Sequence, residues 1–212
     1  MSKGFTLVEL LVVIAIIAAL AAMATPVILK QKKKADMTEA VNNAKQIFYL
    51  MVEFDSDYGE FPSAGTFADT NTTVGTASND FLSQFVNGGY TNSEEIFFAK
   101  GGSPSGNKKP DNVITSTKLL EPGECGFAYV EGQSTSNNSG RAVVVAPFDT
   151  GVKFKQDPYD GKAVALRIDG AVKQLLLDKT SSEPKVGGGK TVFQTGTDTV
   201  WGSDTVTIAK PD

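Results

Sequence analysis

The chain has 212 residues, with 20 basic and 24 acidic side chains, no histidine and one cysteine. The lack of histidine excludes serine–histidine and cysteine–histidine nucleophile systems and histidine metal ligands, and a single cysteine excludes an internal disulfide. Residues 35–212 hold 15 basic and 23 acidic side chains, a net charge of −8, so we expect no nucleic-acid partner, because nonspecific nucleic-acid binding requires a broad positive field.

An unbroken apolar run, residues 10–24, begins directly after Glu9. A carboxylate that faces lipid costs about 2.5–3.5 kcal/mol even on lenient insertion scales. A chain that keeps Glu9 at this place therefore needs a group of opposite charge to meet it, inside the membrane or inside an assembly. A short basic stub with Lys3 and Gly4 precedes the run.

This start resembles the leader of type IV pilins and pseudopilins, over about residues 3–60. The residues that carry the resemblance are Lys3-Gly4 followed by Phe5-Thr6-Leu7-Val8-Glu9. The resemblance implies that a membrane peptidase, prepilin peptidase, cuts between Gly4 and Phe5 and methylates the new amine of Phe5. It also implies that Pro26 stands where the family bends its helix.

Physical reasoning supports an assembly role for the same residues. A free α-amine is normally charged near neutral pH, and Phe5 and Glu9 are about one helical turn apart. Between neighbouring helices the amine of one subunit then meets Glu9 of another and sets their axial stagger. Loss of one partner would leave the other charge buried alone, at about 3–5 kcal/mol.

The resemblance implies a structural protein and no enzyme. The predicted function is a subunit of a type IV pilus-like or type II secretion pseudopilus filament, that is, a helical homo-oligomer. Its implied partners are prepilin peptidase, the inner-membrane assembly platform and membrane lipid. The implied location is a single-pass bacterial inner-membrane protein with a periplasmic head, found after assembly in a filament in the periplasm or at the cell surface.

Two other interpretations of the N-terminus remain open. An ordinary secretory signal peptide would be removed at a small-residue site, so that the mature chain would begin at Ala22 or Thr25. A plain single-pass anchor would keep Met1 and let Glu9 reach toward the interface. The lysine cluster Lys30, Lys32, Lys33 and Lys34 also opposes the expected orientation, since the positive-inside rule alone puts it in the cytoplasm. We interpret these lysines as lying at the outer headgroup level, where they hold anionic lipid, or as lining a filament stem.

The pattern predicts one long helix from Phe5 to Tyr58, bent at Pro26. Its apolar stripe recurs at helical spacing beyond the membrane: Ala40, Ala44, Ile47, Met51, Phe54 and Tyr58. Gly59 and the following Pro62 end it. We therefore divide the chain into a leader (1–4), a transmembrane helix segment (5–29), an amphipathic continuation (30–58) and a globular head (59–212).

The head is predicted to be α+β, with an antiparallel sheet of about four strands packed on the long helix. Ser78 is expected to cap one short helix and Asn92 another. Strands are expected at 127–130, 142–146, 164–168 and 171–177, with Asp169-Gly170 as a type I′ hairpin turn. A further edge hairpin is expected to pair residues 192–193 with 206–208. The tail from Thr180 is expected to be looser, and Cys125 is expected to be a buried small hydrophobe or, alternatively, to form an intermolecular bridge.

The remaining candidate chemistry is acidic. Asp157-Pro158-Tyr159-Asp160-Gly161 resembles a turn of major pseudopilins near which some bind calcium, and Asp198 and Asp204 could join it in space. We interpret the segment instead as a turn held by side-chain hydrogen bonds to the backbone, and we expect no cofactor. The alternative function is a membrane-anchored, non-polymerising, adhesin-like binding module. An anchored hydrolase is disfavoured for want of a nucleophile and base.

Overall fold

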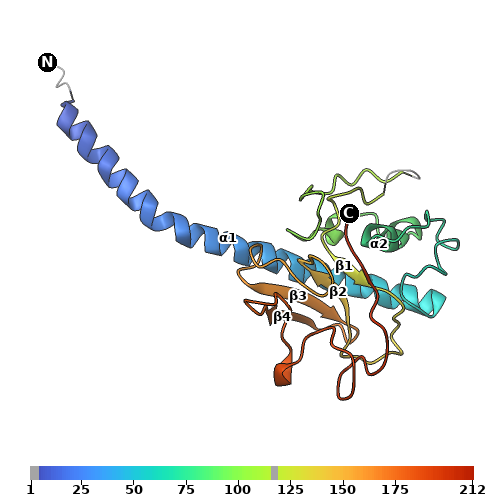
Figure 1. Ribbon diagram of the computed structural model, residues 1–212. Helices are drawn as coiled ribbons and strands as arrows, with labels where there is room; N and C mark the ends of the chain where they lie inside the picture. The colour runs from blue at the N-terminus through green and yellow to red at the C-terminus, as the bar shows by residue number, and fades with distance from the viewer. Residues whose placement is uncertain (1–4, 116–118) are drawn as a thin grey trace.

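The computed structural model describes residues 5–115 and 119–212, so the expected leader with Gly4 lies outside the described residues. A single long helix, α1, carries a head at its C-terminal half, and the rest of the helix projects away from that head as a bare stem (Figure 1). The head contains a five-stranded antiparallel sheet and a second helix, α2. The predicted α+β class is confirmed.

Helix α1 runs from Leu7 to Tyr58, 52 residues, or about 78 Å at ~1.5 Å per residue. It begins at the N-cap Thr6 and ends at Gly59, whose φ of 78° lies in the left-handed region that glycine adopts without strain. The C-terminal end agrees with the prediction, and the helix begins two residues after the predicted start at Phe5. Pro26 lies inside the unbroken helix, and the stem curves gradually along its length in Figure 1.

The second half of α1 buries the predicted stripe. Five of its residues are fully buried: Ala40, Ala44, Ile47, Met51 and Phe54. Tyr58 is only half-buried, because it lies at the helix end, and Met37 is an additional buried member. These side chains join one core with α2 and with the sheet face that turns toward α1. The head is therefore folded around this half of the helix.

The sheet has the order β4-β3-β2-β1-β5 with every neighbouring pair antiparallel. The strands are β1 (Ala128–Val130), β2 (Ala142–Ala146), β3 (Lys162–Arg167), β4 (Val172–Leu176) and β5 (Ile208–Ala209). All five residues of the central strand β2 are buried, as its continuous apolar sequence predicts. The predicted edge hairpin is wrong in its pairing, because β5 pairs with β1 and residues 192–193 form no strand.

The turn between β3 and β4 also differs from the prediction. A type I′ turn needs positive φ at both central residues, but in this turn only Gly170 has positive φ, 77°. The amide of Gly170 donates to the carbonyl of Arg167 (2.9 Å), and the Asp169 carboxylate accepts from the amide of Ala171 (3.0 Å). The acid thus holds the turn with its side chain, while the glycine supplies the left-handed position.

The short helices are partly as predicted. Helix α2 (Ser78–Asn87) exists and ends at Gly88, but its N-cap is Ala77, and the Asp80 carboxylate accepts from the Ala77 amide (2.8 Å). The Ser78 hydroxyl instead donates to the carbonyl of Phe127 (2.6 Å), so the predicted cap at Ser78 is wrong. The second predicted helix is a single 3-10 turn, η1 (Glu95–Phe97), without an Asn92 cap.

A second core lies on the opposite face of the sheet. Its large members come from the loops that follow β2 and β4: Phe148, Phe154, Phe193 and Trp201. The indole of Trp201 donates to the carbonyl of Val192 (2.8 Å). The tail after Thr180 therefore packs against the sheet, which the sequence reasoning took for a looser segment.

Cys125 is fully buried, as predicted. Burial raises the pKa of its thiol to about 11, so the thiol stays protonated at neutral pH. A thiol in this position behaves as a small apolar side chain. Without unfolding it has no access to a second copy of the chain for an intermolecular bridge.

The contact between α1 and the head can be tested at Phe54, whose ring lies 5.5 Å from that of Phe85 and 4.4 Å from that of Tyr58. Phe54→Ala should lower the free energy of unfolding by about 3–5 kcal/mol, because it leaves a cavity in the core. Tyr49→Ala is the matched control, since Tyr49 is exposed on the same helix, and it should change stability by less than about 0.5 kcal/mol. Guanidinium unfolding in detergent, followed by Trp201 fluorescence, measures both. Equal midpoints for the two variants would contradict the packing.

Candidate functional site

The N-terminal end of α1 holds the predicted assembly residues. One carboxylate oxygen of Glu9, Oε2, accepts hydrogen bonds from the amide of Thr6 (2.9 Å) and from its hydroxyl (2.7 Å). The amide of Glu9 donates in return to the Thr6 hydroxyl (3.3 Å). Phe5 is 79% exposed. Glu9 is thus fixed at the first turn of the helix, next to the residue that the predicted cut would make the N-terminus.

This arrangement is a capping box, and the sequence reasoning gave Thr6 no role. Its signal is a threonine followed three positions later by a glutamate, ahead of an apolar run. The box satisfies one oxygen of the carboxylate, whereas Oε1 accepts no hydrogen bond from the described residues. Glu9 is therefore held in place and still has an oxygen free for a cation.

The first half of α1 has no partner in the head. Every residue from 5 to 32 is exposed, and this stretch makes α1 long and apolar enough to cross a membrane. Small residues alternate with large ones along it, with Ala15, Ala18, Ala19 and Ala22 forming small-xxx-small pairs that permit close helix packing. This surface is apolar and exposed, and either lipid or another helix can cover it.

The predicted acidic turn lies where the stem enters the head. Asp157 accepts a hydrogen bond from the Lys33 ammonium (2.5 Å), and Tyr159 is buried in the core that includes the stripe of α1. Burial raises the pKa of the Tyr159 hydroxyl well above its usual value. A second ion pair, Lys100 with Asp36 (2.7 Å), joins head and helix nearby. The turn therefore fastens the head to the stem.

The four calcium candidates do not form one group. Asp157 and Asp160 lie in the same turn, where Asp157 is paired with Lys33 and Asp160 lines a cavity beside the stem. Asp204 is paired with Arg141, and Asp198 lines a cavity elsewhere on the head. Within residues 5–115 and 119–212, the carboxylate trio whose oxygens lie within 4.8 Å of one another is Asp111, Glu121 and Glu124.

That trio already has a cation beside it. The Lys108 ammonium lies 2.9 Å from a carboxylate oxygen of Glu124 and also pairs with Glu121. These two carboxylates raise the pKa of Lys108, so the lysine keeps its charge at neutral pH. The trio is thus a partly neutralised group of acids.

Calcium should consequently leave the stability of the protein unchanged. The unfolding midpoint of the full chain in detergent is expected to be the same in millimolar calcium and in excess chelator, because paired and scattered carboxylates offer no ligand cage. A calcium-dependent rise of the midpoint would contradict this. The variants Glu124→Gln and Asp157→Asn would then tell which group binds the ion.

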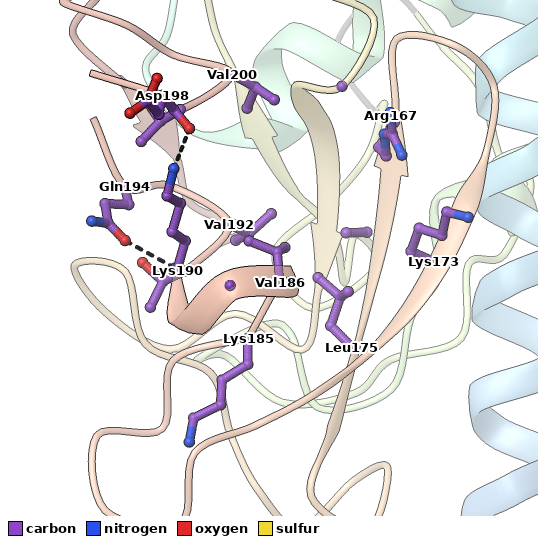
Figure 2. Close-up of a pocket in the computed structure, with 16 residues that line it drawn as sticks. Arg167, Lys173, Leu175, Lys185, Val186, Lys190, Val192, Gln194, Asp198 and Val200 are labelled. Carbon is purple, nitrogen blue, oxygen red and sulfur yellow. Dashed lines mark hydrogen bonds between the residues drawn. The ribbon is translucent and has the colours of Figure 1, made fainter. Parts of the chain in front are cut away.

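A cavity of about 570 Å³ opens on the face of the sheet opposite α1, between β3, β4 and the loops of residues 185–200. Figure 2 shows Leu175, Val186 and Val192 between basic side chains at its margin. These basic side chains are Arg167, Lys173, Lys185 and Lys190. We call this hollow the basic cavity.

Most basic groups around the basic cavity have local partners. Arg167 pairs with Asp169 (3.0 Å), Lys185 pairs with Asp178 (2.6 Å), and the Lys190 ammonium donates to the carbonyl of Asp198. The Lys185 ammonium lowers the pKa of the Asp178 carboxyl well below its usual range. Among the described residues, Asp198 is the one acid that lines the cavity itself. The cavity thus combines an apolar floor with a rim of cations, most of which already have a partner.

Comparison with known proteins gives independent evidence on the family. Residues 1–25 match the model of the prokaryotic N-terminal methylation motif. A fimbrial protein of Neisseria meningitidis is 34% identical over 118 residues, 56% of this chain and 62% of the relative. The fimbrial protein EcpC of Eikenella corrodens is 40% identical over 91 residues, 43% of this chain and 52% of the relative.

The type IV major pilin protein PilA of Myxococcus xanthus is 37% identical over 70 residues, 32% of each chain. The chain thus spans 62% or less of the length of these curated relatives. No solved structure matches it. The motif, the relatives and the long helix on an antiparallel sheet agree, and together they support a likeness of this chain to type IV pilins.

Proposed function

We propose that the chain is a structural subunit of a type IV pilus-like filament, stored in the membrane before assembly. The observation that carries this proposal is the contrast within α1: residues 5–32 are exposed throughout, while the stripe that follows is buried by the head. An apolar surface of this size needs lipid or other protein to cover it. Lipid covers it in storage, and neighbouring helices cover it in the filament.

Processing supplies the charge that assembly uses. We propose that prepilin peptidase cuts between Gly4 and Phe5 and methylates the amine of Phe5, in keeping with the motif over residues 1–25. Oε1 of Glu9 then receives the amine of a neighbouring copy, while Oε2 stays with Thr6. The capping box turns the acid toward the end of the helix in advance, so little side-chain freedom is lost on pairing.

Close packing of the stems holds the polymer together in this proposal. The alanines listed above let two helix backbones approach, and Pro26 contributes to the curvature of the stem because it cannot donate a backbone hydrogen bond. We propose that the head lies in the periplasm and that the assembly platform lies in the inner membrane. Because the relatives named above are fimbrial and pilin proteins, we favour a pilus over a secretion pseudopilus.

The N-terminal residue of the native protein distinguishes prepilin processing from signal-peptide removal and from an uncleaved anchor. N-terminal sequencing or intact mass measurement of protein from its own cells should give a methylated Phe5. A start at Ala22 or Thr25 would mean a removed signal peptide, and a start at Met1 would mean a plain anchor. Either of the last two would end the filament proposal.

The pairing role is tested by Glu9→Ala in cells that make filaments. Processing should stay intact, but incorporation into sheared filaments should fall by tenfold or more, because the buried amine of a neighbour would lose a partner worth about 3–5 kcal/mol. Glu53→Ala is the matched control, since Glu53 is exposed on the same helix, and it should leave incorporation unchanged. Normal filaments from Glu9→Ala would refute the pairing.

The alternative is an anchored, non-polymerising module that binds a surface ligand. The basic cavity is the observation that favours it, because it offers an apolar floor and four cationic side chains. Negative-stain microscopy of sheared surface material separates the two functions by the presence or absence of filaments. A filament subunit can also carry such a cavity on its outer face, so the basic cavity alone does not decide between them.

A further inference from the structure

A second, smaller cavity of about 230 Å³ lies where the stem leaves the head. Helix α1 contributes Lys30, Lys34 and Thr38 to its wall, and the head contributes Lys162 from β3 and Gln174 from β4. The cavity therefore joins the stem to parts of the chain that are distant in sequence. We call it the junction cavity.

The charge of the junction cavity is unbalanced. Three lysines and one carboxylate, Asp160, line it. The adjacent Lys33 is paired with Asp157, but Lys30, Lys34 and Lys162 form no ion pair with the described part of the chain. Three convergent cations against one carboxylate, at the base of an acidic head, favour an anion from outside the chain.

The position of the cavity along α1 indicates where that anion comes from. At ~1.5 Å per residue, the stretch from Leu7 to Leu29 is about 35 Å long, slightly more than the ~30 Å hydrocarbon core of a bilayer. Lys30 is the first charged residue after Glu9. When this stretch spans the membrane, Lys30 and Lys34 lie at the level of the lipid phosphates, one turn apart on the same face.

We infer that the junction cavity binds the phosphate of an anionic phospholipid, with Lys30, Lys34 and Lys162 as its donors. This inference rests on the proposed storage of the subunit in the membrane. A cavity of about 230 Å³ exceeds the ~30 Å³ of one water molecule several-fold, so a phosphate group fits. Free phosphate offers the same chemistry, but the bilayer presents its phosphates at this depth, and Lys162 reaches them only because the head is docked beside the stem.

The test uses the full chain in nanodiscs or mild detergent and measures bound phosphatidylglycerol and phosphatidylcholine by native mass spectrometry. Phosphatidylglycerol should bind more tightly, and Lys162→Gln should weaken it about fivefold, the factor that corresponds to ~1 kcal/mol per lysine at an anionic surface. Lys162→Arg keeps the charge and should retain binding. Two matched controls should have no effect: Lys179→Gln in the head and Lys32→Gln in the stem, both exposed and outside the cavity.

Three outcomes would overturn the inference. Equal binding of the two lipids would remove the need for an anionic headgroup. A loss from Lys32→Gln as large as that from Lys34→Gln would mean diffuse attraction to the surface and no defined cavity. Displacement of the lipid by millimolar inorganic phosphate would mark a site for soluble phosphate.

The lipid-binding inference and the proposed filament function can fail independently of each other. If the native chain starts at Phe5 and forms filaments but shows no lipid selectivity, the junction cavity inference fails alone. If the chain starts at Met1 and yet binds phosphatidylglycerol through Lys162, the cavity belongs to a plain anchor and the filament proposal fails alone.

Discussion

Helix α1 presents two apolar surfaces in series, and the head can cover only the second. The stripe from Met37 to Phe54 is buried by α2 and the sheet, whereas no described part of the head buries residues 5–32. Because both surfaces belong to one unbroken helix, the position of the head fixes how far the stem projects. The chain is thus a folded domain with an exposed apolar helix at one end, and lipid or another protein must cover that helix.

Glu9 restricts which partner can cover this apolar helix. A purely apolar stem would accept lipid or any apolar helix, since hydrophobic contact is non-directional. The capping box with Thr6 places one carboxylate at a defined height and leaves one of its oxygens available. A partner with a cation at the matching height is then favoured over all other registers, because a misaligned pair leaves a charge buried alone. In the proposed filament, specificity would come from the Glu9 carboxylate and holding strength from the apolar surface around it.

The features that sequence predicted well are those with a long periodic signal. The stripe of α1 repeats over several turns, and β2 is a continuous run of buried apolar residues, so helix length, helix face and the central strand followed directly. The resemblance at residues 3–9 pointed to the same family as the motif match. Short sequence signals failed where a tertiary contact competed with them. The Ser78 hydroxyl donates to the carbonyl of Phe127, and the Asp80 carboxylate accepts from the amide at the start of α2 in its place.

Other misses had no local signal. Residues 192–193 look like a strand, but their apolar side chains serve the second core together with Trp201. Asp-Gly favours a type I′ turn, but here the Asp169 side chain holds the Ala171 amide. The basic cavity and the junction cavity each draw residues from separate parts of the chain. Spacing along a sequence cannot reveal groups that only the tertiary fold brings together.

The lysine cluster after the membrane segment shows why charge counting alone misleads in such a chain. The positive-inside rule applies to short loops, and long domains translocate largely regardless of charge; here a whole folded head follows the cluster. The acidic turn at residues 157–161 neutralises Lys33, and the junction cavity gathers Lys30 and Lys34 with Lys162. Folding of the head therefore converts a run of free charges into a paired lysine and an anion site. A cluster of that kind suits the phosphate layer of either leaflet, and it does not require a head on the cytoplasmic side.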